Sequence, residues 1–377
     1  MNMKKLLSFA ISRYLAFLCL GFWLLCVGEV FASTYVGGIV STNTTWAASG
    51  SPYILTSDVQ IASGVTLTID PGVTVNGSGF AIKVGGHGTL SAHGASGAEI
   101  VFNDCYIYSA YDSSTHSLID ISHASINGGE INNNSSAGYI SVILRDSIVK
   151  NLPQIHIWSQ SSDVVDNYIE RNVFFNTGGI LVDLGSSNGV DAYVRNNVFQ
   201  LDGQACGANH ADDFYAVGIG FVRSNAGSQL IVEYNSFLST NRVAIGTPSP
   251  YRIYGMAYLN MIAINNYWNT TDPAVIDGMI YDGLDDVTLP IISYTPFLTA
   301  PHANTPAPLT GQTDCSRVVR GSMNQDIGQY KAICANQNTH QVVTIPVVYG
   351  QTWDCAAAGL TVNKGDDVTV TLRAKIK

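Results

Sequence analysis

Charged side chains are scarce in this sequence, because Asp, Glu, Lys and Arg together make up only 12% of its 377 residues. Glycine, with 36 copies, and tyrosine, with 19, are abundant in comparison. A composition this apolar and aromatic excludes an intrinsically disordered chain. It is typical of a β-rich extracellular protein.

The sequence also lacks an apolar run long enough to cross a membrane. Its longest candidate, Leu15–Val27, has 13 residues, whereas a spanning helix needs about 20. Basic residues precede this run at Lys4, Lys5 and Arg13, and Val30–Ala32 offers a small-residue cleavage pattern. Residues 1–32 are therefore predicted to be a secretory signal. We expect a mature protein that is secreted or held at the cell surface, without a membrane span.

Basic groups are few, and this bears on the choice of partner. Without residues 1–32, which carry three basic groups and one acidic group, 15 basic and 27 acidic residues remain, a net charge of −12. Such a surface repels the phosphate backbone of nucleic acids. Nucleic acid is therefore not expected as a partner.

Cysteine is sparse and its number is odd. Cleavage after residue 32 leaves five cysteines, at the following positions: Cys105, Cys206, Cys315, Cys334 and Cys355. An odd number in an exported chain implies an unpaired thiol or an intermolecular bridge. A disulfide is expected within the group formed by the last three, which share one short segment.

A short pattern recurs six times between residues 121 and 268. It consists of an apolar residue, two variable residues, usually Asn, one variable residue and a large apolar residue. The copies are Ile121–Ile126, Ile143–Ile148, Val164–Ile169, Val194–Phe199, Val232–Phe237 and Ala263–Trp268. By subtraction, the residue numbers at which successive copies start differ by 22, 21, 30, 38 and 31. Repetition on this scale indicates a solenoid whose units bury their apolar faces by stacking.

The units are short, β-branched and aromatic, and Gly, Asn and Ser separate them, so they are predicted to be strands. We expect the first residue of each copy to form one apolar column and the last residue to form a second. The Asn between them, at Asn167, Asn197, Asn235 and Asn266 with Asp146 as a variant, is expected at a bend. There it tolerates a left-handed backbone and bonds to its copies in adjacent coils, which is a structural role.

Upstream strands and the closing segment carry a family resemblance. Val65–Ile69 and Val73–Val75 alternate with period two around an Asp70–Gly72 turn, and Asn265–Asp272 runs on toward Tyr294–Leu298. These stretches resemble the first coil and the closing segment of secreted, pectin-lyase-like proteins. The resemblance implies an all-β fold, a right-handed parallel β-helix spanning residues 33–298.

Residues 299–309 hold three prolines in a short span and are predicted to be a stiff linker. Residues 310–377 are predicted to form a small β domain. Its expected strands are Gln341–Val348, Leu360–Val362 and Val368–Leu372. So small a unit gains stability from a disulfide.

Candidate chemistry falls in the long intervals after Phe199 and Phe237, because a solenoid displays function on the loops that project from it. In pectin-lyase-like enzymes, carboxylates hold Ca²⁺ and an Arg or Lys abstracts a proton from a uronate. The weak catalytic candidates of this kind are Asp202, Asp212, Asp213, Arg223 and Arg252. The adjacent aspartates also fit the solvated tip of a polar loop, which is the favoured interpretation.

Two further groups are candidates for binding. Aromatic rings stack on pyranose faces, so the candidate ligand-binding residues are Tyr251, Tyr254, Tyr258 and Trp158. Outer packing explains such tyrosines equally simply. A calcium ion is a possible ligand of the acidic run Asp277, Asp282, Asp285 and Asp286, although a solvated terminus is the simpler interpretation.

Three functions follow as hypotheses. The first is an exported β-helix protein that interacts with extracellular polysaccharide. The second is an adhesin or structural spacer without catalytic activity. The third is a Ca²⁺-dependent polysaccharide lyase. The sequence leaves open whether the protein is an enzyme.

Overall fold

The computed structural model describes most of the chain after the predicted signal, which itself lies outside the described residues. The described residues are 33–109, 116–132, 139–152, 154–159, 166–175, 177, 179–184, 191–200, 217–222, 229–238, 245–246, 261–285, 291–310, 320–322, 329–347, 352–356, 358–361 and 368–375. None of the helices within these ranges is long and apolar enough to cross a membrane.

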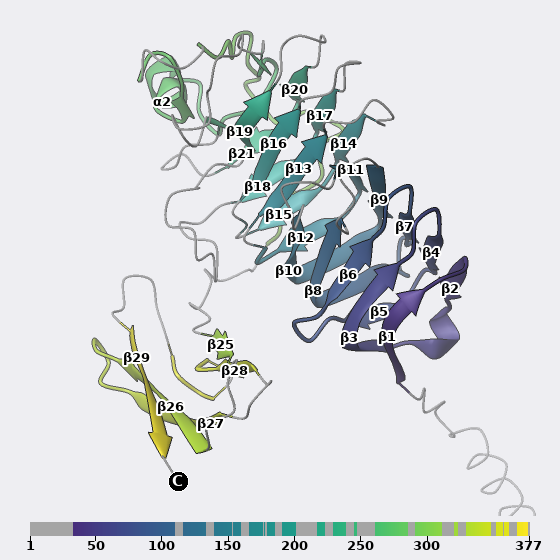
Figure 1. The fold of residues 1–377 in the computed structure, drawn as a ribbon. Coiled ribbons are helices and arrows are strands. Elements are labelled where there is room, and N and C mark those ends of the chain that lie inside the picture. The colour runs from purple at the N-terminus through teal and green to yellow at the C-terminus, as the bar shows by residue number, and fades with distance from the viewer. Residues whose placement is uncertain are drawn as a thin grey trace, which may run out of the picture.

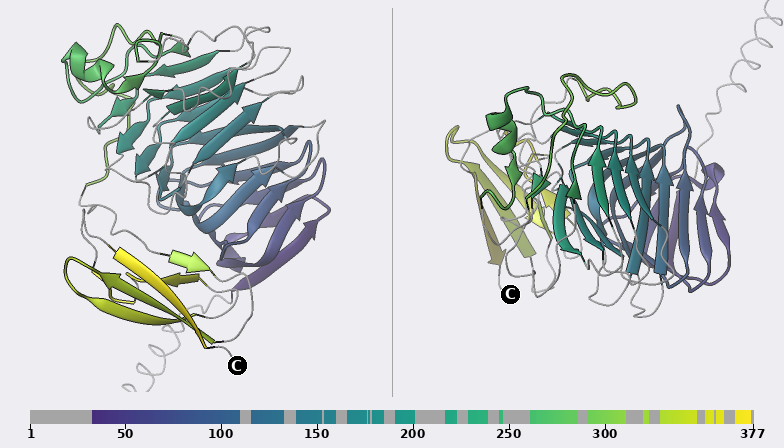
Figure 2. Two further views of the ribbon diagram at one scale, coloured as in Figure 1. Left: turned by 60° about the vertical axis from the view of Figure 1, so that its left-hand side comes forward. Right: turned by 90° about the horizontal axis from the view of Figure 1, so that it is seen from above.

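The chain winds into a parallel β-helix with three strand faces (Figure 1). Face one is a nine-stranded parallel sheet. Its strands are β2 (Thr44–Trp46), β4 (Thr66–Ile69), β7 (Thr89–His93), β9 (His116–Ser122), β11 (Tyr139–Arg145), β14 (Asn167–Glu170), β17 (Ala192–Arg195), β20 (Leu230–Glu233) and β23 (Met261–Ile262). The turned views show the strands of the solenoid stacked side by side along its axis (Figure 2).

A second, branched sheet supplies the other two faces. Four strands extend over both: β1 (Thr34–Val40), β3 (Tyr53–Ile61), β8 (Ile100–Ser109) and β10 (Ala124–Asn132). Face two continues through β5 (Thr74–Asn76), β12 (Ile148–Lys150), β15 (Val173–Phe175), β18 (Val198–Gln200) and β21 (Ser236–Phe237). Face three continues through β6 (Ala81–Val84), β13 (Ile155–Ser159), β16 (Ile180–Leu184), β19 (Val217–Val222), β22 (Ile245–Gly246) and β24 (Ile280–Tyr281). The predicted fold class is thereby confirmed.

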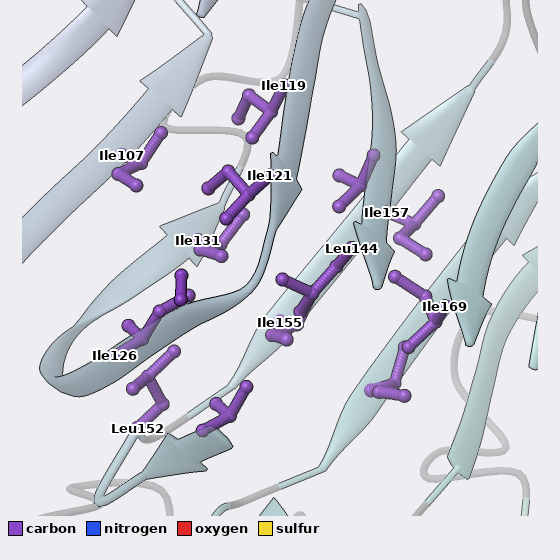
Figure 3. Packing of buried hydrophobic residues seen from close by; sticks show 14 of the residues in the cluster. Ile107, Ile119, Ile121, Ile126, Ile131, Leu144, Leu152, Ile155, Ile157 and Ile169 are labelled. Carbon is purple, nitrogen blue, oxygen red and sulfur yellow. The ribbon is translucent and has the colours of Figure 1, made fainter. Parts of the chain in front are cut away.

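Buried apolar side chains fill the interior of the solenoid in columns, as the sequence predicts (Figure 3). The column from face one contains Trp46, Ile69, Ala92, Ile121, Leu144, Ile169, Val194, Val232 and Ala263. The column from face two ends in an aromatic stack. Phe174, Phe199, Phe237 and Trp268 follow each other with ring centroids 4.9, 5.2 and 4.8 Å apart.

The predicted frame of two copies is wrong. Leu144, and not Ile143, pairs with Ile121, so the copy beginning at Ile143 is displaced by one residue. The next rung presents Ile169 and Phe174 to the two columns, so Val164–Ile169 is displaced by five. Equivalent corner positions on successive rungs, from Ala124 onward, are separated in sequence by 23, 25, 25, 38 and 31. The interval before Val194 is therefore an ordinary coil without an insertion, whereas the two later intervals do carry extra residues.

The tight corner between faces one and two separates two roles that the sequence assigned to one residue. The left-handed residue is the one before the ladder position, with φ between 48° and 60°. These residues are His123, Asp146, Arg171, Asn196, Tyr234 and Asn265. The residue after it forms the buried ladder, which consists of Ser147, Asn172, Asn197, Asn235 and Asn266. Asp146 is thus a corner residue, and Asn167 lies on β14, where its side chain accepts from the Val142 amide at 2.8 Å.

The last coil is closed by a short helix, α2 (Pro273–Asp277), and by the segment that follows it. Asp272 and Pro273 begin this helix. The Asp272 side chain caps the Ala274 amide and the proline occupies the first turn, the positions that each residue favours. Ile276, Met279 and Ile292 then complete the apolar core.

The proline-rich segment 299–309, predicted as a linker, is fastened to the solenoid, and we refer to it as the strap. The His302 ring lies 4.6 Å from that of Tyr234, and its Nδ1 is 2.8 Å from Asn196 Nδ2. Leu309 exchanges two hydrogen bonds with the Gln200 side chain, at 2.7 and 3.1 Å. The strap therefore runs back from the last rung toward earlier ones.

The C-terminal unit has its own apolar cluster. An antiparallel sheet contains β27 (Val342–Val347), β26 (Gln329–Asn336) and β29 (Val368–Lys375), and β25 (Arg320–Ser322) pairs with β28 (Thr352–Asp354). The expected disulfide is present between Cys334 and Cys355. The sequence missed β25, β26 and β28, and the strand predicted to begin at Leu360 is wrong, because Leu360 and Thr361 are not in a strand.

Candidate functional site

Most residues that the sequence singled out for chemistry lie outside the described residues. These are Asp202, Asp212, Asp213, Arg223 and Arg252, together with Tyr251, Tyr254 and Tyr258. Trp158 lies on β13, where its backbone pairs with that of Asp183. These assignments remain predictions.

The acidic run near the end of the solenoid can be placed in part. Asp277 is exposed at the end of α2, and Asp286 lies outside the described residues. The buried Asp282 accepts from the amides of Leu284 and Ile292, at 2.8 and 2.6 Å, and Asp285 accepts from the Asp282 amide at 3.1 Å. Two of these carboxylates therefore hold the closing loop together. Within the described ranges, no group of three or more His, Cys, Asp or Glu side chains is arranged to hold a metal ion.

A different cluster lies on the outward side of face three, where four of its side chains are partly exposed and the fifth, His156, is buried at 8% exposure. Its members, which we call the polar row, are Tyr106, Tyr108, Glu130, Asn132 and His156. Tyr106 pairs with Glu130 and Tyr108 with Asn132 between β8 and β10. His156 follows on β13, directly after the residue that pairs with Ile131. Strand register alone therefore brings together five side chains from three successive rungs.

Hydrogen bonds connect four members of the polar row. The Tyr108 hydroxyl donates to one oxygen of Glu130 at 3.2 Å, and Asn132 Nδ2 donates to the other at 2.6 Å. Asn132 Oδ1 lies 3.2 Å from His156 Nδ1. The ring centroids of Tyr106 and Tyr108 are 5.7 Å apart and inclined by 40°. The carboxylate is thus oriented by two donors, and the amide joins it to the imidazole.

The electrostatic surroundings of the polar row are acidic. Burial raises the pKa of Tyr108, and the nearby Glu130 carboxylate raises it further. Burial likewise raises the pKa of Tyr106, with smaller contributions from Glu130 and Asp104. Both phenols therefore stay protonated at neutral pH and can donate hydrogen bonds.

Lys83 precedes Tyr108 in the same outward register, but its charge is already matched. Its ammonium group lies 2.6 Å from Asp58 Oδ2. Burial acts to raise the pKa of Asp58, but hydrogen bonds from Lys83 and the Ala81 amide outweigh this effect and lower it. The lysine therefore does little to offset the negative charge of Glu130.

Regular strands over a packed core lie beneath the polar row. Its side chains alternate with inward residues of β8, β10 and β13, namely Cys105, Ile107, Ile131, Ile155 and Ile157, none of which is more than 1% exposed. Regular strands over a packed core hold side chains in place more firmly than loops do. The polar row is consequently preorganised.

Face one offers an instructive contrast. Tyr168 and Tyr193 stack there with centroids 5.1 Å apart and an interplanar angle of 10°. Arg145 lies 4.8 Å over the first ring and Arg195 4.3 Å over the second. These rings contact each other and a guanidinium group, which covers part of their flat surfaces.

Sequence reasoning missed the polar row because it looked for function in the insertions between strands. A signal was present, since one sequence separation, 24, recurs between Tyr106 and Glu130, between Tyr108 and Asn132, and between Asn132 and His156. That interval matches one coil of the solenoid, so polar and aromatic residues at this spacing predict a row on one face.

Comparison of this chain with protein-family models, with curated proteins and with solved structures finds no match in any of the three. The fold and the polar row therefore stand on the sequence and the structure alone.

Proposed function

We propose that this is an exported protein whose β-helix binds extracellular polysaccharide through the polar row. The observation that carries the proposal is the bonded chain Tyr108–Glu130–Asn132–His156, with Tyr106 beside it. Sugars present many hydroxyl groups and flat apolar ring faces. Carboxylate, amide, imidazole and phenol groups complement the hydroxyls, and tyrosine rings complement the ring faces.

The repetitive architecture supports a polymeric ligand. The outward register extends from the polar row to Gln60 and Lys83 on one side and to Leu181 on the other. Neighbouring strands lie about 4.8 Å apart, so the exposed or partly exposed positions from Gln60 to Asn132 follow one another along the axis, whereas His156 and Leu181 are each only 8% exposed. A long chain lying along the exposed positions meets several rungs at once.

Export is part of the proposal and rests on two features. One is the signal-like sequence at residues 1–32. The other is the disulfide of the C-terminal unit, since disulfides persist in oxidising compartments. We also propose that the chain is related to the pectin-lyase-like proteins that its coil sequences resemble.

Affinity electrophoresis of the mature chain in gels containing different polysaccharides tests the binding. The variant Y106A/Y108A should lose retardation, because it removes both rings of the polar row. The matched control Y168A/Y193A removes two tyrosines from face one and should be retarded like the unmodified protein. Equal losses in the two variants, or no retardation in any gel, would overturn the proposal.

A spacer without catalytic activity is the second candidate, and the internal columns favour it. The buried asparagine ladder and the aromatic stack run continuously through the later rungs. Both make the solenoid a stiff rod. A rod that binds no glycan but adheres through the fragment 310–377 would establish this function instead.

The lyase hypothesis rests on Asp202, Asp212, Asp213, Arg223 and Arg252, which lie outside the described residues. Following the absorbance of unsaturated products from uronate polymers tests it directly. The change D212N/D213N should abolish such activity without affecting folding. An absence of product with and without Ca²⁺ removes the hypothesis.

A further inference from the structure

We propose that the glycan bound by the polar row carries amino groups, and that this face discriminates against uronate polymers. The inference rests on the proposed polysaccharide binding and specifies its ligand class. It reverses the expectation drawn from the lyase hypothesis, in which a uronate is the substrate.

The Glu130 carboxylate accepts hydrogen bonds from Tyr108 and Asn132 and can accept more. A carboxylate has about four acceptor sites, and the bonds from Tyr108 and Asn132 use one site on each oxygen. Both bonds orient the group while leaving acceptor capacity on each oxygen. An ammonium group is the donor that such a carboxylate binds most strongly, because both partners are charged.

Lys83, the lysine nearest the polar row in register, is not free to pair with a ligand carboxylate. Recognition of a uronate carboxylate requires a positive group, and Lys83 is the basic side chain whose register adjoins the polar row. Its ammonium is paired with Asp58 at 2.6 Å. A uronate at this face would meet the Glu130 carboxylate, while the lysine beside it in register is already paired.

The size of the discrimination follows from Coulomb's law. At a partly exposed site, repulsion between two like charges about 6 Å apart weakens binding about tenfold relative to a neutral ligand group. Attraction between a charged amino group and the Glu130 carboxylate strengthens binding by about the same factor. Both effects weaken at high salt, because the screening length falls from about 10 Å at 0.1 M to about 3 Å at 1 M.

Titration calorimetry with three oligosaccharides of equal length provides the test. Glucosamine oligomers should bind about tenfold more tightly than their neutral N-acetylated counterparts, and oligogalacturonate about tenfold more weakly than the neutral oligomers. In 1 M salt the three affinities should converge. The variant E130Q should remove the order at low salt as well, with an unchanged circular dichroism spectrum.

The net charge of the protein is itself negative, so a control must separate the site from general attraction. D277N removes one negative charge at the exposed end of α2, away from the polar row, and should keep the order of affinities. If D277N and E130Q behave alike, the selectivity does not come from the polar row and the inference is wrong.

Failure of the inference and failure of the proposed function give different results. Tightest binding of oligogalacturonate, abolished by Y106A/Y108A, would retain polysaccharide binding and overturn the preference for amino sugars. A lack of binding of all three oligosaccharides would overturn both.

Discussion

Replacing Asn197 with alanine should destabilise the solenoid strongly, although the change removes only a few atoms. Asn197 is fully buried, and its Oδ1 accepts from the amide and from Nδ2 of Asn172 at 2.9 and 3.1 Å. Its own Nδ2 donates to the Ile169 carbonyl at 2.7 Å and to Asn235 Oδ1 at 3.0 Å. One residue therefore connects three consecutive rungs.

The magnitude follows from the groups left behind. In N197A the amide of Asn172 and one hydrogen of its Nδ2 lose their acceptor in the buried interior. Each unsatisfied buried donor costs about 1–3 kcal/mol, so the expected loss is about 2–6 kcal/mol. The other Nδ2 hydrogen still reaches the Leu144 carbonyl at 2.8 Å, so it does not add to the loss.

Urea unfolding followed by far-ultraviolet circular dichroism measures the effect. N127A is a matched control, because Asn127 also accepts from an asparagine of the next rung, Asn151, at 2.7 Å but on the exposed surface. The free energy of unfolding of N127A should be lower by no more than about 0.5 kcal/mol. If N197A costs no more than N127A, the ladder does not stabilise the stack in the way described.

Three further outcomes are expected. Replacing Cys334 and Cys355 with alanine should destabilise the C-terminal unit by about 3 kcal/mol, because the bridge closes a loop with a sequence separation of 21. Limited proteolysis should then cleave the variant faster within that unit only. Faster cleavage within the solenoid would contradict the prediction. The pKa of Tyr193 is raised to about 12, chiefly by burial and then by its hydrogen bond to a carboxylate, so stability present below pH 10 should fall as the pH rises from 10 toward 12. Urea midpoints across that range should show a shallower decline in Y193F, and an unaltered slope would count against this assignment. The hydrogen bond from Arg171 lowers the pKa of Asp146, so the pair stabilises the fold above about pH 4 and loses its effect as the pH falls through the lowered pKa. R171A should lower the free energy of unfolding by about 0.5–1 kcal/mol at pH 7 and by nothing in strong acid. A loss that persists in acid denaturation experiments would point to packing instead.

The columns of the β-helix were predictable wherever only one frame fitted the repeat. Val194, Val232 and Ala263 occupy the predicted column, and Phe199, Phe237 and Trp268 occupy the other. These copies share an asparagine at the same offset. The two apolar residues that bracket it can then reach the interior in only one register.

The predicted register of the repeat was wrong where neighbouring residues fitted the pattern equally well. Ile143 and Leu144 are adjacent apolar residues of opposite strand parity, and only Leu144 is fully buried. Two nearby asparagines, Asn167 and Asn172, each match the motif. Both are buried, so composition alone cannot distinguish them. The regular sequence separation of 25 between ladder positions, which links Asn172 to Asn197, selects the second.

The polar row was less accessible to prediction than the core. The apolar columns can be recognised from the apolar residues of the sequence. The polar row depends instead on which outward residue of one strand lies beside which residue of the next. Glu130 and Asn132 could be assigned to Tyr106 and Tyr108 only after the register was known. A shift of one residue turns an outward side chain inward.

The strap changes how the protein would carry a load. A pull on the C-terminal unit reaches the solenoid first at Leu309 and Gln200, rather than at the last coil. The contacts of Thr305 and His302 with the earlier rungs would then open in turn, like a strip peeled from its free end. Fully extended, residues 299–309 would span at most about 35–40 Å, so release of these contacts would let the C-terminal unit move farther from the rungs while the coils stay intact.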